Sequence, residues 1–370
     1  MSANPLVRLV ELGQSPWLDF ITRDLVQSGA LGRLIEEDAL RGMTTNPTIF
    51  EKAVAGSDLY DADIAALTAR GLEPAHVFEA LAIADVQEAC DLFRPVYNDA
   101  EGQDGFVSLE VSPTLAYDAA ATVREARRLW SAVGRRNLMI KIPGTHPGLA
   151  AITESLAAGI NVNVTLLFSV DRYAEVIEAY CAGLERRLAH GQPIDRLASV
   201  ASFFVSRVDT KIDPLLDAIG TDAARALRGT IATANALVAY ERFERSFAGP
   251  RWDALARHGA GVQRPLWAST RTKDPAYADV HYVEALVAPR TVNTLPPETL
   301  AAYRDHGAPV VRVHEMLPAA TGRLRALAGL GIDLAGVTRA LEEEGVAKFA
   351  ASYTALLSGV EAKAAALSGI

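Results

Sequence analysis

The sequence predicts an α/β protein, an eight-stranded parallel (β/α)8 TIM barrel with extra N- and C-terminal helices. Short β-like runs alternate along the chain with longer segments of helical periodicity, which is typical of repeated βα units on a parallel sheet. The glycine-rich fingerprints GxGxxG and GxxxxGK[ST], which follow strands in nucleotide-binding open sheets, are missing. Eight runs in series therefore favour a closed barrel. The runs are 15–20, 41–45, 106–111, 138–143, 161–168, 199–206, 264–270 and 291–296.

Helical periodicity fills the intervals between these runs, most clearly over 119–130, 173–189 and 230–247. The segment VTRALEEEGVAKFAASYTALL spaces its apolar residues three and four apart, so a helical extension over about 319–370 should pack on a barrel core over about 15–318. No low-complexity tract or Pro/Ser-rich linker divides the chain, and residues 1–370 are expected to form one domain. The polar, glycine-containing stretches are expected to be surface excursions; they are 97–105 and 248–263.

The composition disfavours several classes of partner. The net charge of -9 argues against nucleic acid, which binds basic faces, although local arginines can still hold a small anion. Cys90 and Cys181 are too few for a disulfide framework or a zinc site, and the seven histidines show no metal spacing, so neither a metal nor a cofactor is expected. No apolar run is long enough to span a bilayer, and the N-terminal segment lacks a signal-peptide core, which predicts a cytoplasmic protein without membrane contact. Monomer and homodimer both stay open.

Several of the predicted strands carry one polar residue near the carboxyl end, where a parallel strand should be apolar on both faces. Asp19, Glu110 and Lys141 interrupt three of the runs in this way. In the fifth run Asn163 and Thr165 share the parity that should face the barrel interior. Barrel enzymes place their sites at this end of the strands. Because buried charges are costly unless paired, Lys141, Glu110 and Asp19 are expected to neutralise one another.

Lys141 has two interpretations at this stage. It could be a core lysine held in an ion pair by Glu110 or Asp19, since structural ion pairs also occur inside proteins. Alternatively, it could be a nucleophile, because desolvation lowers the pKa of a lysine from ~10.4 and frees the amine to attack a carbonyl. Two neighbouring carboxylates would then carry the proton transfers.

The other candidate residues also have a structural reading beside a functional one. Asn46 can be an Asn–Pro turn former, and Arg207 and Arg271 can be surface charges, yet late barrel loops often hold phosphate. The remaining five lysines offer no competing nucleophile: three lie in helical, solvent-facing contexts and two follow strand ends, where they could at most touch a phosphate. The first three are Lys52, Lys348 and Lys363, and the other two are Lys211 and Lys273.

Five segments together resemble the longer bacterial form of the transaldolase family, over nearly the whole chain. TTNPTIF (44–50) is similar to the family's signature after the second strand, and LMIKIPGTHPGLAAI (138–152) to the signature around its Schiff-base lysine. GINVNVTLLFS (159–169), SFFVSR (202–207) and WAST (267–270) are similar to its later strands and follow in the right order.

The resemblance implies a role for each site residue. Lys141 would attack the ketose C2 carbonyl, Glu110 and Thr165 would hold a catalytic water, and Asp19 would take the proton of the C4 hydroxyl. The resemblance implies that Asn46 and Asn163 hold the hydroxyls of the three-carbon unit, with Ser202 beside them, and that Thr44 and Phe204 also contact the substrate. Arg207, Ser269 and Arg271 would bind the phosphate, with Lys273 as the alternative to Arg271.

The implied reaction moves a dihydroxyacetone unit from sedoheptulose 7-phosphate to glyceraldehyde 3-phosphate, giving erythrose 4-phosphate and fructose 6-phosphate in the non-oxidative pentose phosphate pathway. Two alternatives remain. A fructose-6-phosphate aldolase of the same fold would release dihydroxyacetone, but such enzymes tend to carry Gln in place of Glu110 and Tyr in place of Phe204. An inactive barrel serving as a binding protein would have lost Lys141, Glu110 or Asp19, and all three are present.

Overall fold

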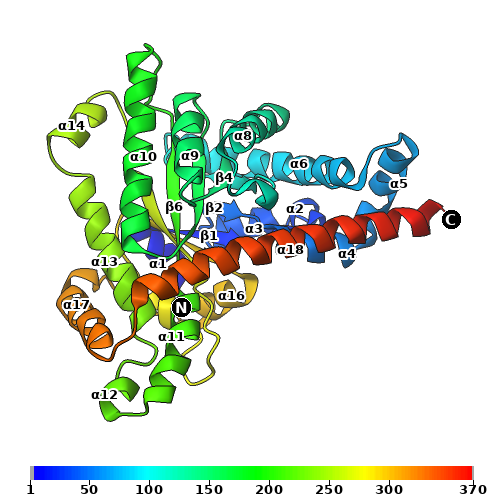
Figure 1. Cartoon of the computed structure of the whole chain (residues 1–370). Coiled ribbons are helices and arrows are strands. Elements are labelled where there is room, and N and C mark those ends of the chain that lie inside the picture. The colour runs from blue at the N-terminus through cyan, green and yellow to red at the C-terminus, as the bar shows by residue number, and fades with distance from the viewer. Residues whose placement is uncertain (1–3, 369–370) are drawn as a thin grey trace.

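Eight parallel strands close into a barrel in sequence order in the computed structural model, which describes residues 4–368 (Figure 1). The predicted fold class is confirmed, and each strand matches its predicted run within two residues at either end. The strands are β1 (Gln14–Asp19), β2 (Gly42–Thr44), β3 (Phe106–Glu110), β4 (Leu138–Pro143), β5 (Val162–Leu167), β6 (Ser199–Phe204), β7 (Arg264–Ala268) and β8 (Thr291–Leu295).

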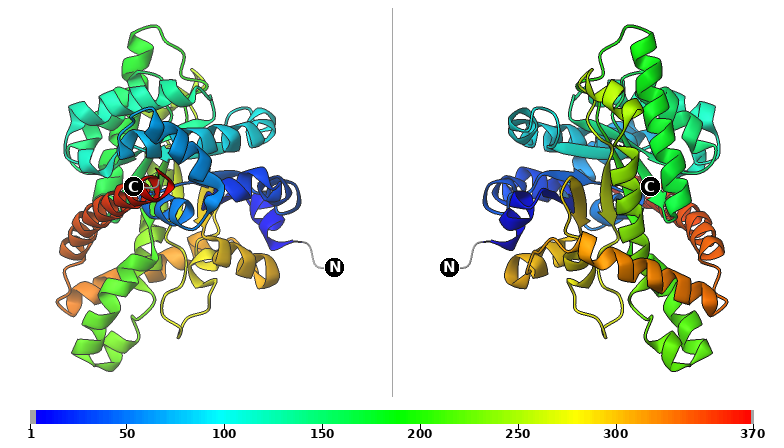
Figure 2. Two further views of the ribbon diagram at one scale, coloured as in Figure 1. Left: turned by 90° about the vertical axis from the view of Figure 1, so that its right-hand side faces the viewer. Right: turned by 90° about the vertical axis from the view of Figure 1, so that its left-hand side faces the viewer.

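Helices surround the barrel, as the two side views show (Figure 2). The three predicted helical segments are confirmed as α8, α10 and α13. The helices are α1 (Pro5–Glu11), α2 (Arg23–Gln27), α3 (Ala30–Glu37), α4 (Pro47–Ala55), α5 (Asp61–Ala69), α6 (Pro74–Leu92), α7 (Arg94–Asp99), α8 (Ala119–Val133), α9 (Gly148–Ala157), α10 (Val170–Ala189), α11 (Ser206–Ile219), α12 (Asp222–Arg225), α13 (Ile231–Ser246), α14 (Pro250–Ala256), α15 (His281–Ala285), α16 (Pro297–His306), α17 (Val313–Gly329) and α18 (Leu334–Ser368), with the 3-10 turns η1 (Asp58–Tyr60) and η2 (Pro113–Leu115).

The start of β2 requires a glycine because of the indole beside it. Gly42 is the parallel partner of Trp17, which is fully buried. A Cβ on Gly42 would lie 2.5 Å from a ring carbon of Trp17, far inside van der Waals contact. This close approach sets β1 and β2 at the spacing that brings Asp19 beside Thr44.

The two segments predicted to be surface excursions expose many of their residues, and each also sends side chains into the core. In 97–105, Asp104 accepts a hydrogen bond from Trp17 Nε1 at 2.9 Å and another from the Ser15 hydroxyl. In 248–263, α14 buries Trp252, whose ring lies 4.7 Å from that of Phe247. Polar and glycine residues dominate the composition of these segments, so the sequence pattern does not indicate the few side chains that enter the core.

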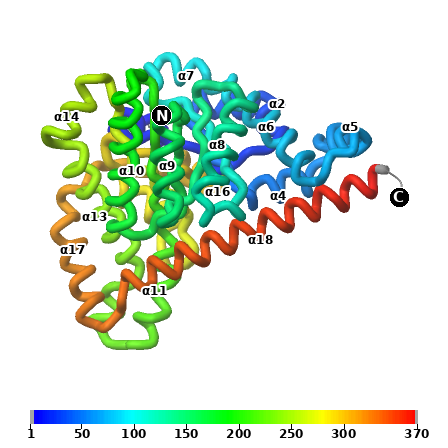
Figure 3. The backbone as a smooth tube through the Cα atoms, turned by 45° about the horizontal axis from the view of Figure 1, so that its top comes forward, coloured from blue at the N-terminus to red at the C-terminus, as the bar shows by residue number. Residues whose placement is uncertain are grey.

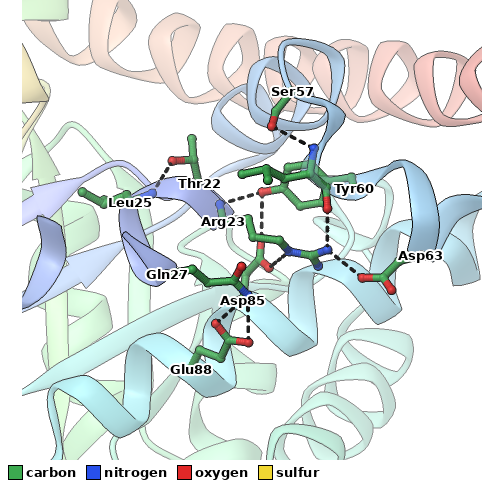
Figure 4. Close-up of polar contacts among 10 residues, drawn as sticks. Thr22, Arg23, Leu25, Gln27, Ser57, Tyr60, Asp63, Asp85 and Glu88 are labelled. Atoms are coloured by element: carbon green, nitrogen blue, oxygen red, sulfur yellow. Dashed lines mark hydrogen bonds and ion pairs between the residues drawn. The ribbon is translucent and has the colours of Figure 1, made fainter. Parts of the chain in front are cut away.

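A buried polar cluster ties the segment after β1 to the helices around it (Figure 4). Arg23 Nε donates to Asp85 of α6 at 3.0 Å, and its Nη1 donates to Asp63 of α5 at 2.6 Å. The Tyr60 hydroxyl donates to the other Asp85 oxygen at 2.8 Å, and the Arg23 guanidinium lies 4.5 Å from the Tyr60 ring centroid. Because the charges are paired, the cluster can stay buried.

The C-terminal helices pack on the barrel, as predicted, with α17 beginning at Val313 rather than near Ala319. The long helix α18 runs across one end of the barrel from α11 to α4 and α5 (Figure 3). Hydrogen bonds from Lys363 to the carbonyls of Val54 at 3.1 Å and Ser57 at 2.6 Å fasten its distal part. Lys363 is therefore not solvent-facing, contrary to expectation. Among residues 4–368, no helix is both long and apolar enough to cross a membrane.

Candidate active site

A cavity of about 1380 Å³ opens at the carboxyl ends of the strands, beneath α18. All the predicted site residues except Glu110 and Asn163 line it, and these two lie directly behind the lining. Lys273, the alternative phosphate ligand, also lines the cavity, as do residues that the sequence did not single out as site residues; they include Lys52, Thr294, Glu298, Lys348 and Phe349.

Lys141 lies at the floor of this cavity and is only 4% exposed. In the barrel register it stands between Glu110 of β3 and Asn163 of β5. Its Nζ donates to the Thr45 carbonyl at 2.9 Å and lies 3.5 Å from Glu110 Oε2. The ring centroid of Phe349, from α18, lies 5.8 Å from the same nitrogen. The amine is thus buried, with one carboxylate beside it.

Two carboxyl groups accompany the lysine, and both are less acidic than usual. Burial raises the pKa of Glu110 to about 7, although the positive charge of Lys141 acts in the opposite direction. Desolvation also raises the pKa of Asp19, against the attraction of Lys141 and a 2.7 Å hydrogen bond donated by Thr44. A carboxyl group with a pKa of about 7, such as Glu110, can give up and take back a proton near neutral pH.

Three oxygens near Lys141 have no hydrogen-bond partner within residues 4–368: both carboxylate oxygens of Glu110 and the hydroxyl of Thr165. A buried polar oxygen without a partner is rare and often marks chemistry. By contrast, the neighbouring Asn163 has a partner at each polar atom, although its Nδ2 still has a second hydrogen to donate. Its Nδ2 donates to Ser108 at 3.0 Å, and its Oδ1 accepts from Ser202 at 2.7 Å.

Asn46 serves the structure and also faces the cavity. Its side chain accepts a hydrogen bond from the Ile49 amide at 3.1 Å and caps the N-terminus of α4, with Pro47 in the first position of the helix. Asn46 therefore caps a helix where the sequence suggested a turn, and the same side chain lines the cavity.

Positive charges gather at the outer part of the cavity. Arg207 is partly buried, lies 5.1 Å from the Phe204 ring and has a lowered pKa through desolvation, so it is not a plain surface charge. Arg271 is exposed and pairs with Glu298 at 3.1 Å. Lys273 keeps exposed surface, yet desolvation at the cavity wall and the charges of Arg207, Lys348 and Arg271 lower its pKa to about 8.

The backbone bends sharply where the strands enter the site. Ser269, directly after β7, has φ of 55°, and Leu166, in the β5–β6 irregularity, has φ of 62°. Left-handed backbone at non-glycine residues costs about 1–3 kcal/mol and concentrates at functional sites.

Within residues 4–368 no group of three or more His, Cys, Asp or Glu side chains could hold a metal ion.

Comparisons with known proteins agree with this geometry. A sequence model of the family described as Transaldolase/Fructose-6-phosphate aldolase matches residues 16–360. The chain is 51% identical to a transaldolase of Frankia alni over 97% of both chains, and 46% identical to "Transaldolase 2" of a Nostoc species over the full length of both. A transaldolase of Thiobacillus denitrificans is 48% identical over 94% of this chain and 97% of its own. The resemblance found in the sequence is confirmed, and the chain belongs to the transaldolase and fructose-6-phosphate aldolase family.

Proposed function

We propose substrates, residue roles and an order of steps for the transaldolase activity that the family and its full-length relatives assign to this chain. The donor is sedoheptulose 7-phosphate, the acceptor is glyceraldehyde 3-phosphate, and a dihydroxyacetone unit passes between them within the pentose phosphate pathway. The observation that carries the proposal is Lys141, buried at the cavity floor next to Glu110 and within the electrostatic influence of Asp19, two carboxyl groups of raised pKa.

The first stage is imine formation. The neutral Lys141 amine attacks the C2 carbonyl, and the carbinolamine then loses water to give a protonated imine. The protons move through a water molecule bound by Glu110 and Thr165, a role supported by their unpartnered oxygens. A carboxyl group whose pKa is about 7 can serve as both acceptor and donor in this exchange.

The second stage is cleavage and transfer. Asp19 removes the proton of the C4 hydroxyl, the C3–C4 bond breaks, and its electron pair passes to the iminium, which becomes an enamine. The aldose leaves, and C3 of the enamine attacks the aldehyde carbon of the acceptor. Asp19 returns the proton to the new hydroxyl, and water releases the product from Lys141. Asn46, Asn163, Ser202 and Thr44 hold the hydroxyl groups of the three-carbon unit.

The basic test is an assay of glyceraldehyde 3-phosphate formation from fructose 6-phosphate and erythrose 4-phosphate. Without acceptor, the protein should release almost no dihydroxyacetone. An inactive protein would support the binding-protein alternative. A protein that cleaves fructose 6-phosphate as fast as it transfers would be an aldolase, and the proposed function would be wrong.

Phe204→Tyr should raise dihydroxyacetone release and lower transfer to erythrose 4-phosphate. Phe204 lines the cavity and has no hydroxyl, so the added phenol would supply a proton to the enamine carbon. Glu110→Gln should act in the same direction, because it removes the carboxylate that competes for the proton of the bound water. The measurement is the ratio of free dihydroxyacetone to transfer product. Phe204→Leu, which also lacks a hydroxyl, is the matched control; an equal rise in that variant would refute the explanation.

Arg207→Ala should lower kcat/KM for phosphorylated substrates about 10- to 150-fold, because a charge-assisted hydrogen bond contributes ~1.5–3 kcal/mol. The loss should lie mainly in KM if the phosphate is bound alike in the ground and transition states. Lys273→Ala should cost more than Arg271→Ala, since Arg271 is exposed and paired with Glu298. Steady-state kinetics of the three variants show which of these side chains bind the substrate phosphate. Unchanged kinetics for Arg207→Ala would make Arg207 a structural residue.

A further inference from the structure

Three of the lysines differ from the other lysines of the chain in having no paired carboxylate in the part that the structure describes. Lys52, Lys273 and Lys348 line the active-site cavity, and none of them forms an ion pair or a hydrogen bond within residues 4–368. The other three lysines are each paired with a carboxylate: Lys141 with Glu110, Lys211 with Glu344 and Lys363 with Asp61. In a chain with 45 acidic and 36 basic residues, unpaired lysines gathered in one cavity need an explanation.

The charge balance of the cavity is positive although the whole chain carries -9. Its acids are already engaged, since Glu298 pairs with Arg271 and Asp19 accepts from Thr44. The cations at the outer part repel one another: after desolvation, the positive charges of Arg207, Lys348 and Arg271 are the further cause of the lowered pKa of Lys273. Like charges held close together favour a bound anion, which relieves the repulsion.

Lys348 reaches this group from α18, and its neighbours on the helix fix its position. Gly345, one turn earlier, lies against the barrel: a Cβ there would be 2.9 Å from Leu166 Cδ2 and 3.8 Å from Arg207 Nη1. Phe349, the next residue, is buried with its ring near Lys141. This face of α18 therefore covers the mouth, with Lys348 beside Arg207 and Lys273.

A second, smaller cavity of about 570 Å³ lies on the outer side of the same cations. Arg207, Lys273 and Lys348 line both cavities, so they form the partition between the substrate cavity and this outer space. A phosphate group at the partition would contact cations from three separate parts of the chain: α11, the segment after β7, and α18.

We propose that Lys348 is a specificity-determining residue that binds the substrate phosphate together with Arg207 and Lys273. The C-terminal helix then selects phosphorylated over unphosphorylated sugars in addition to covering the site. The inference rests on the proposed function, because it takes a sugar phosphate as the ligand. It differs from the phosphate site implied by the family signatures, which lies entirely on the late strands and their loops.

The test is the acceptor selectivity of Lys348→Ala. With fructose 6-phosphate as donor, kcat/KM is measured for erythrose 4-phosphate and for unphosphorylated erythrose. In the variant, the ratio of kcat/KM for erythrose 4-phosphate to kcat/KM for erythrose should fall about tenfold or more, the range of a lost charge-assisted bond. Lys348→Arg should restore most of the selectivity. Because Lys348 is exposed and alanine favours helices, the substitution should leave α18 intact.

Lys211→Ala is the matched control. Lys211 is an exposed lysine on α11 that pairs with Glu344 of α18 and does not line the substrate cavity. It should keep the wild-type selectivity ratio. An unchanged ratio in Lys348→Ala, or an equal fall in Lys211→Ala, would overturn the assignment. Borohydride trapping on Lys141 distinguishes failure of the Lys348 proposal from failure of the proposed function. An adduct on Lys141 with an unchanged selectivity ratio refutes only the role of Lys348. The absence of an adduct on Lys141 refutes the proposed mechanism.

Discussion

Lys141→Arg should abolish turnover of fructose 6-phosphate and erythrose 4-phosphate. The guanidinium group remains protonated at neutral pH, so it has no free pair of electrons for attack on a carbonyl. The variant keeps a positive charge near Glu110, and the loss should therefore come from chemistry and not from an unpaired buried acid. The measurement is transfer activity alongside circular dichroism and thermal unfolding, which should stay close to wild type.

Trapping with borohydride identifies directly which lysine forms the imine. In the wild-type protein, fructose 6-phosphate followed by borohydride should fix a three-carbon adduct on Lys141, located by peptide mass mapping. Lys273 is the relevant competitor, because it lines the same cavity and its pKa is lowered to about 8. An adduct on Lys273, or turnover that survives in Lys141→Arg, would show that another amine is the nucleophile.

Asp19→Asn should lower kcat about 10²- to 10⁴-fold, the usual contribution of a positioned general base. An amide cannot take the proton of the C4 hydroxyl, but its oxygen can still accept the hydrogen bond from Thr44. Imine formation should continue, since it depends on Lys141, Glu110 and Thr165. The enzyme should therefore stall before the C3–C4 bond breaks.

The mass of the trapped adduct reveals where the reaction stops. Borohydride should fix a six-carbon sugar phosphate on Lys141 in Asp19→Asn, in place of the three-carbon unit found in the wild type. Thr44→Val removes the partner of Asp19 but leaves the carboxylate, so it should still give the three-carbon adduct. A three-carbon adduct at wild-type rate in Asp19→Asn would remove Asp19 from the cleavage step.

The strands could be predicted from their apolar runs. The polar residues of the barrel interior could be predicted because they interrupt these runs. Lys141, Glu110 and Asp19 interrupt apolar runs, and the parallel register then brings Glu110 next to Lys141 without further information. The late-loop residues Arg207 and Ser269 follow strand ends and converge on the same cavity for the same reason. In each case the position of a residue relative to the end of its strand is enough to place it at the cavity.

The contribution of α18 could not be predicted in this way. Lys348 and Phe349 lie far along the chain from any strand, in a helix whose periodicity indicates only that one face is buried. Which part of the barrel that face covers depends on the path of the chain after β8. Likewise, Asp104 lies in a polar stretch, and nothing local indicates that its carboxylate meets Trp17 inside the barrel.

The position of α18 has a consequence for co-translational folding of the enzyme. Chains emerge from the N-terminus, and the strands that close the barrel, β1 and β8, are both made before residue 296. The barrel can therefore close while α18 is still inside the exit tunnel. During that interval Lys141 has its carboxyl neighbours but lacks the Phe349 ring above it. Among the helices of residues 4–368, the last to be synthesised is thus the one that covers Lys141.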